Sequence, residues 1–121
     1  MSRRILVTGS RNWPDLHAVY RALREAVHDQ DWDDVVIVHG GCPTGADQFA
    51  ARWAALVGVK QEVYRADWAT HGRAAGPLRN RRMVAAGADL CLAFPLRESR
   101  GTRGCMALAR SAGIPVKEYT Q

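Results

Sequence analysis

Short runs of β-branched and other apolar residues alternate with segments of helical periodicity from one end of the chain to the other. The apolar runs predict five strands, at residues 5–8, 35–38, 61–64, 90–94 and 115–119. The periodic segments predict four helices, at residues 15–27, 45–57, 78–86 and 102–112. Strands that alternate with helices form a parallel sheet with helices on both faces. The expected fold class is therefore α/β, with a doubly wound sheet.

The chain of 121 residues has the length of one domain, which we expect to span residues 1–121. Only three apolar residues follow the arginines at its start, too few for the apolar part of a signal peptide. No apolar run reaches the roughly 18–20 residues that cross a bilayer. The odd number of cysteines (Cys42, Cys91 and Cys105) indicates reduced thiols. We therefore expect a cytoplasmic protein with no membrane partner.

The net charge of +5 is unevenly distributed along the sequence. Residues 71–110 hold eight arginines against two acidic residues, Asp89 and Glu98. The planar guanidinium group of arginine binds phosphate oxygens in pairs, which lysine cannot do. This cluster predicts an anionic partner, either a small phosphorylated ligand or the backbone of a nucleic acid.

The loops after the strands carry most of the glycines, and in a doubly wound sheet ligands bind at this edge. Gly40 and Gly45 have the spacing of half a P-loop, but Ala46 and Asp47 replace the lysine and hydroxyl residue that bind a triphosphate and its magnesium. The dinucleotide fingerprint GxGxxG is also missing after the first strand. These departures argue against a nucleoside triphosphatase and an NAD-dependent dehydrogenase.

What remains in the 40–47 segment is a glycine-rich turn that leads into a helix, where free N–H groups favour an anion. Thr44 is expected to cap this helix. Asp47 has two interpretations: it contacts a ligand, for example a ribose hydroxyl, or it stabilises the first helical turn without a ligand. No metal or cofactor is predicted, since His39 and Cys42 have no second pair of ligands near them in the sequence.

Two further segments have the same character. Arg79, Arg81 and Arg82 lie near the start of a predicted helix, where cations are unfavourable unless an anion binds there. Residues 99–102 form a second small turn with a hydroxyl at a helix start, next to Arg100. The long stretch 67–77 is expected to be irregular, and it carries Trp68.

Together these motifs resemble the YspA-like branch of the SLOG superfamily, which also contains the DNA-processing protein DprA and the LOG phosphoribohydrolases. The resemblance rests on VTGSRNW at 7–13, GGCPTGAD at 40–47, GPLRNRRM at 76–83 and SRGT at 99–102. It implies a Rossmann-like sheet with strand order 3-2-1-4-5 and a crevice for a nucleotide or a nucleotide-derived ligand. By analogy with related folds, a homodimer is expected.

The resemblance also allows two alternatives. Arg79 matches the catalytic arginine of the LOG enzymes, which implies an N-glycosidic hydrolase acting on a nucleotide. However, Cys105 stands where those enzymes have an essential glutamate, so that Asp47 and Glu98 are the candidates to replace it. The Arg79-Asn80-Arg81 string is similar to one in DprA, which implies binding of single-stranded nucleic acid, with Trp13 and Trp68 as stacking residues.

The leading hypothesis is a domain that binds a nucleotide or an ADP-ribose-like ligand without a cofactor. Phosphate would lie on the two glycine turns and be held by the arginines, while Trp13 or Trp68 covers the base. The expected ligand-binding residues are Gly9, Ser10, Arg11, Trp13, Gly40, Gly41, Thr44, Gly45, Asp47, Arg79, Asn80, Arg81, Ser99, Arg100, Gly101 and Thr102.

Overall fold

Five parallel strands form the centre of the molecule in the computed structural model, which describes residues 2–121. The strands are β1 (Arg3–Gly9), β2 (Val35–His39), β3 (Lys60–Val63), β4 (Leu90–Phe94) and β5 (Val116–Glu118). They pair in the order β3-β2-β1-β4-β5, which confirms the predicted topology. Strands β2 and β3 are added on one side of β1, and strands β4 and β5 are added on the other side. The carboxyl ends of β1 and β4 therefore flank the switch point of the fold.

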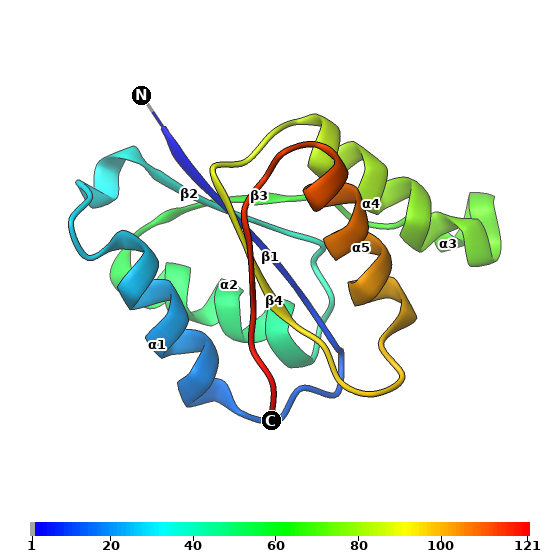
Figure 1. The fold of residues 1–121 in the computed structure, drawn as a ribbon, viewed down its shortest axis with the longest axis horizontal. Coiled ribbons are helices and arrows are strands. Elements are labelled where there is room, and N and C mark those ends of the chain that lie inside the picture. Colours follow the sequence, from blue (N-terminus) through cyan, green and yellow to red (C-terminus); the bar gives the residue numbers. More distant parts are fainter. Residues whose placement is uncertain (1) are drawn as a thin grey trace.

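Helices cover both faces of this sheet (Figure 1). The helices are α1 (Leu16–Val27), α2 (Gly45–Val57), α3 (Trp68–His71), α4 (Ala75–Ala85) and α5 (Arg100–Ser111), with short 3-10 turns at Trp32–Asp34 and Gly72–Ala74. One apolar cluster lies between the sheet and helices α1 and α2, and the other lies between the sheet and α4 and α5. None of the helices between residues 2 and 121 has the length and apolar character that a membrane crossing requires.

The apolar periodicity placed most elements within a few residues of their observed bounds. Strand β4 is buried along its whole length, as its unbroken apolar run predicts. Strand β3 lies at the sheet edge, in agreement with its polar sequence.

The expectation that residues 67–77 are irregular is wrong, because α3, a 3-10 turn and the first residues of α4 occupy this segment. Asp67 caps α3, since its Oδ1 accepts a hydrogen bond from the Thr70 N–H at 3.1 Å. Helix α4 begins at Ala75 and not at residue 78. Pro77 fits inside its first turn, where a backbone N–H has no partner within the helix.

Candidate functional site

Two hollows open beside the carboxyl ends of the strands, at the edge of the sheet where ligands bind in this class of fold. The first hollow has a volume of about 620 Å³ and lies against the 40–44 loop, with Arg11, Arg65, Trp68 and Arg79 among its lining residues. The second hollow has a volume of about 570 Å³ and lies between the starts of α4 and α5. Arg11, Trp68 and Arg79 line both hollows, so the two are neighbours on one surface.

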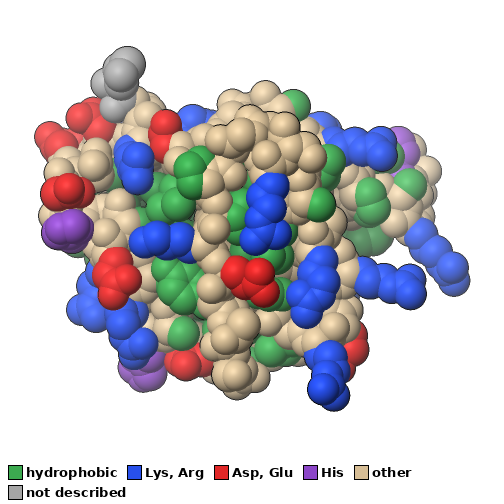
Figure 2. Space-filling view, in the orientation of Figure 1, with side chains coloured by type: hydrophobic (Ala, Val, Ile, Leu, Met, Phe, Trp, Pro, Cys, Tyr) green, Lys and Arg blue, Asp and Glu red, His purple; other side chains and the backbone are tan. Residues whose placement is uncertain are grey.

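The surface around the hollows is strongly basic. Figure 2 shows Lys and Arg side chains projecting from the side of the molecule that carries α3, α4 and α5, whereas the side with α1 has acidic and basic groups mixed together. No Asp or Glu side chain of residues 2–121 lines either hollow. The clustering of arginines in the sequence therefore becomes a cluster in space.

Arg79 is fixed in place by backbone carbonyls of two neighbouring segments. Its Nη1 donates to the Gly40 oxygen at 2.8 Å and to the Tyr64 oxygen at 3.4 Å, while its Nε donates to Asn80 Oδ1 at 2.8 Å. A Cβ atom at Gly40 would overlap the guanidinium group. Glycine is thus needed at position 40 so that the arginine can reach the loop.

The 40–45 loop is held against the loop after β1. Thr44 Oγ1 donates to the Arg11 carbonyl oxygen at 2.8 Å, and the Thr44 side chain makes no capping bond to α2. Thr44 is the N-cap residue of α2, as expected, but its hydroxyl is engaged with the other loop and not with the helix. Gly45 has φ of 73°, and a Cβ atom there would overlap the Ser10 oxygen. These contacts place Arg11 at the rim of the first hollow.

Asp47 lies beneath the loop and not in either hollow. The residue is only 7% exposed, and its Oδ2 accepts a hydrogen bond from the Cys42 N–H at 3.3 Å. Burial raises the pKa of this carboxyl, although nearby His39 and Arg79 act in the opposite direction. Of the two interpretations of Asp47, the structure supports the local structural one, and the expected contact with a ribose hydroxyl is corrected.

Two substitutions of Asp47 should distinguish the effect of its hydrogen bond on stability from the effect of its charge. Because the pKa of Asp47 is raised in the folded protein, the folded state binds more protons than the unfolded chain at pH values above 3.8. The free energy of unfolding therefore falls as the pH rises from 3.8 toward the folded-state pKa. Asp47→Asn keeps an acceptor for Cys42 and removes this loss, so its stability relative to the natural protein should increase between pH 4 and 7. Asp47→Ala should destabilise by about 1–3 kcal/mol, since it leaves a backbone N–H without its acceptor. Urea denaturation of both variants at several pH values tests this. Equal stability changes for the two would contradict it.

The second hollow is built from α4, α5 and the end of β1. Arg73, Arg81 and Arg100 line it together with the shared Arg11 and Arg79. Asn80 also lines it, and its Nδ2 donates to the Gly101 oxygen at 3.3 Å, which connects α4 to α5. Residues 100–102 form the first turn of α5, so the expectation of a glycine loop at 99–102 is wrong. Ser99 Oγ accepts a hydrogen bond from the Leu96 N–H at 2.8 Å.

Two of the expected ligand-binding residues, Trp13 and Gly9, have packing roles instead. Trp13 is 2% exposed and packs edge-on against Phe94, with 5.3 Å between the ring centroids. The expectation that Trp13 covers a base is therefore corrected. Gly9 allows α2 to approach, since a Cβ atom there would lie 2.5 Å from that of Ala46. Thr102 is 5% exposed and lines only a smaller hollow near the β1 loop. Trp68, in contrast, is 53% exposed beside both main hollows.

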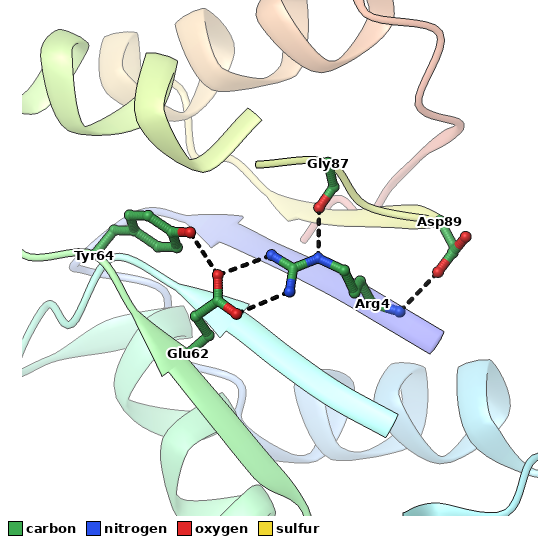
Figure 3. A network of polar contacts seen from close by, with 5 residues as sticks. All are labelled: Arg4, Glu62, Tyr64, Gly87 and Asp89. Carbon is green, nitrogen blue, oxygen red and sulfur yellow. Dashed lines mark hydrogen bonds and ion pairs between the residues drawn. The ribbon is translucent and has the colours of Figure 1, made fainter. Parts of the chain in front are cut away.

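A polar network around Arg4 and Glu62 holds the side chain of Tyr64 (Figure 3). The carbonyl oxygen of the same Tyr64 accepts from Arg79. Arg4 Nη1 and Nη2 donate to the two oxygens of Glu62 at 2.8 and 2.9 Å, and its Nε donates to the Gly87 oxygen at 2.8 Å. The Tyr64 hydroxyl donates to Glu62 as well. This network joins β1, β3 and the turn before β4, and it fixes the segment that positions Arg79.

Glu62→Gln should weaken this network and change the response to acid. Hydrogen bonds from Arg4 and Tyr64 lower the Glu62 pKa from 4.5 to about 2. Its contribution to stability is therefore complete above pH 4.5 and is lost as pH falls toward 2. The side chain is 37% exposed, so solvent screening limits the loss in Glu62→Gln to about 0.5–1 kcal/mol at pH 7. Thermal melts at pH 7 and pH 3 should show a smaller difference between the two proteins at pH 3. An unchanged difference would contradict the assignment.

The sequence pattern of the YspA, cpYpsA-related SLOG family matches residues 3–71, which is more than half of the chain. The chain belongs to this family. It is also 52% identical over 124 residues to the gene 61 protein of Mycobacterium phage D29, covering 97% of this chain and 96% of the phage protein.

Two solved structures have the same fold as this SLOG protein. DNA processing protein A (DprA) from Streptococcus pneumoniae superposes with a TM-score of 0.76 at 16% identity, over 97% of this chain and 50% of DprA. The Moco carrier protein from Chlamydomonas reinhardtii superposes with a TM-score of 0.68 at 15% identity, over 100% of this chain and 78% of the carrier. The SLOG chain thus spans half the length of DprA, and at these identities the similarity concerns the fold.

In this SLOG protein, Cys105 is fully buried in the apolar cluster under α5. Burial raises the pKa of its thiol. Cys91 is also buried, and its pKa is raised to about 12, in agreement with a core position. Within residues 2–121, no three His, Cys, Asp or Glu side chains gather where they could hold a metal ion.

Arg65 lines the first hollow and Arg73 lines the second, and neither was among the expected ligand-binding residues. Arg65 comes directly after the Tyr64 that ends the predicted third strand, so its place at the carboxyl edge was a usable signal. Arg73 belongs to the arginine cluster of residues 71–110, but the 67–77 segment was expected to be irregular, so its position could not be predicted.

Proposed function

We propose that this protein binds a small phosphorylated ligand of the nucleotide type in the first hollow. The observation that carries the proposal is the presence of Arg11, Arg65 and Arg79 around one hollow without a carboxylate. Guanidinium groups form paired, charge-assisted hydrogen bonds with phosphate oxygens. In addition, its volume of about 620 Å³ lies within the range of sites for small molecules.

The exposed indole of Trp68 supports a nucleotide more than a bare phosphate. This side chain lies at the border of the first hollow with 53% of its surface accessible. An aromatic face beside a phosphate site offers stacking to a base. The fold neighbours are consistent with this ligand class, since one is named for DNA processing and the other for carrying Moco.

We do not extend the proposal to hydrolysis of an N-glycosidic bond. Such a reaction develops positive charge on the sugar and needs a carboxylate close to it. Cys105, at the position of the expected glutamate, is 0% exposed, and Asp47 is occupied with the amide of Cys42. The chemistry of the lining residues therefore supports binding.

Calorimetry with a panel of nucleoside 5′-monophosphates tests the proposal. Arg65→Ala should raise the Kd of the tightest nucleotide about 10- to 100-fold, because a hydrogen bond to a charged group contributes about 1.5–3 kcal/mol. Arg21→Ala removes the same charge from exposed α1, remote from the hollow, and should leave the Kd unchanged. Absence of binding by every nucleotide, or equal Kd values for both variants, would contradict the proposal.

Single-stranded nucleic acid is a second candidate, favoured by the exposed Trp68 next to several exposed arginines. It predicts an affinity that falls steeply with salt concentration, since each phosphate contact releases counterions. A gel shift that is absent or insensitive to salt would dismiss it. The cytoplasmic location and the homodimer stay predictions.

A further inference from the structure

The second hollow has the character of a binding site in its own right. Its volume is about 570 Å³, and five arginines line it without any carboxylate. Three of them, Arg73, Arg81 and Arg100, belong to this hollow and not to the first. Positive charges placed close together repel one another, so the arrangement is unfavourable unless an anion lies among them.

In the part of the chain that the structure describes, three of the five arginines that line the second hollow have no protein partner. Within residues 2–121, the side chains of Arg73, Arg81 and Arg100 make no hydrogen bond and no ion pair. Other arginines of the same protein are paired: Arg4 binds Glu62, and Arg110 lies 3.8 Å from Glu118. The guanidinium groups of Arg73, Arg81 and Arg100 are thus available to a ligand.

The surface of α5 leaves the second hollow open. Gly101 and Gly104 line it, one turn apart on the helix. A Cβ atom at either position would meet no atom within 4 Å, so no packing contact requires glycine there. Glycine inside a helix costs about 1 kcal/mol relative to alanine. Side chains at these positions would fill the space between α4 and α5 that the arginines surround.

The first and second hollows share a border made of Arg11, Trp68 and Arg79. Each has a volume within the range that holds one small molecule, so that a single mononucleotide would occupy one of them and leave the other empty. Each also has arginines of its own: Arg65 in the first, and Arg73, Arg81 and Arg100 in the second. The pair is therefore suited to two phosphate groups that lie apart.

We propose that the ligand is a dinucleotide with two phosphate groups, one bound in the first hollow and the other in the second. This inference rests on the proposed function of the first hollow and specifies its ligand class. Trp68, at the border, lies where it can stack on a base of such a ligand. The second hollow supplies affinity that a mononucleotide cannot use.

Calorimetry with matched ligands tests this inference. The probes are the four 5′-phosphorylated homodinucleotides, which carry two phosphates, the same dinucleotides without the 5′-phosphate, and the four mononucleotides. The tightest two-phosphate dinucleotide should bind at least tenfold more tightly than either matched ligand with one phosphate. Arg81→Ala should remove most of this gain and leave the Kd of the mononucleotide unchanged, while Arg65→Ala should weaken both.

A second variant tests the role of the second hollow without changing the charge of the protein. Gly104→Leu should fold and melt at the same temperature or higher, because its Cβ atom meets no atom within 4 Å and leucine favours a helix. It fills the second hollow, so it should weaken the dinucleotide at least tenfold and leave the mononucleotide unaffected. Arg21→Ala on α1 should change neither Kd.

The outcomes distinguish this inference from the proposed function. If mononucleotides bind and the second phosphate adds nothing, or if Arg81→Ala and Gly104→Leu have no effect, the inference is overturned and the proposed function stands. If no probe binds, both fail. If only a single-stranded 12-mer binds, the dinucleotide is excluded and the inference is overturned.

Discussion

Gly45→Ala is expected to destabilise the protein by about 3 kcal/mol and to prevent nucleotide binding. Gly45 has φ of 73°, and an L-residue in this left-handed conformation costs roughly 1–2 kcal/mol. In addition, the new Cβ atom would overlap the Ser10 oxygen and lie 2.6 Å from Arg11 Cα. Both atoms belong to the backbone and cannot rotate away, and such overpacking typically costs 1–3 kcal/mol more. Relief of the overlap would move the loop that carries Arg11.

Gly58→Ala is the matched control for this effect. Gly58 ends α2 with φ of 78°, but a Cβ atom there would meet nothing within 4 Å. The control should therefore lose only the conformational part, about 1 kcal/mol, and should bind nucleotide normally. Chemical denaturation gives both free energies of unfolding. Equal losses in the two variants would show that the two loops do not meet at Gly45 as described.

Arg79→Ala is expected to raise the Kd for nucleotide about 100-fold, equivalent to about 3 kcal/mol. Arg79 lines both hollows, and its guanidinium group also joins the Gly40 and Tyr64 carbonyls. The variant therefore loses a phosphate contact and the contact that orders the 40–41 loop. Arg79→Lys keeps the charge but not the planar group, so its Kd should lie between those of the natural protein and Arg79→Ala.

Thermal melts separate this loss from misfolding. The carbonyls released in Arg79→Ala belong to Gly40, which is buried, and Tyr64, which is partly buried, so the melting temperature should fall by several degrees while the protein stays folded. Calorimetry then measures the loss of affinity on folded protein. A Kd within threefold of the natural protein would show that Arg79 has only a structural role.

The sheet could be predicted from the sequence because its signal is local. Runs such as residues 35–38 and 90–94 are apolar without alternation, which is typical of strands buried on both faces. The strand order came from the resemblance to a known family. The first turns of α4 and α5 were placed late, since residues 75–77 and 100–101 contain glycine and proline. These residues are poor helix formers, but a first turn tolerates them.

The candidate site could be predicted only as a set of loops. Arg11, Arg79, Arg81 and Arg100 were expected in it, and the structure places all of them around the two hollows. Trp13 and Asp47 were assigned ligand contacts that tertiary packing rules out. Whether an aromatic or acidic loop residue faces solvent or the interior depends on contacts far along the sequence, such as those of Trp13 with Phe94.

A crystal structure of the protein grown with the tightest-binding mononucleotide is the most direct test of the central claim. The claim is that guanidinium groups from three separate loops and helices hold phosphate beside the Gly40 loop. We expect phosphate oxygens within about 3 Å of the side-chain nitrogens of Arg11 and Arg65. A nucleotide bound elsewhere on the molecule, with the first hollow holding only solvent, would contradict the claim.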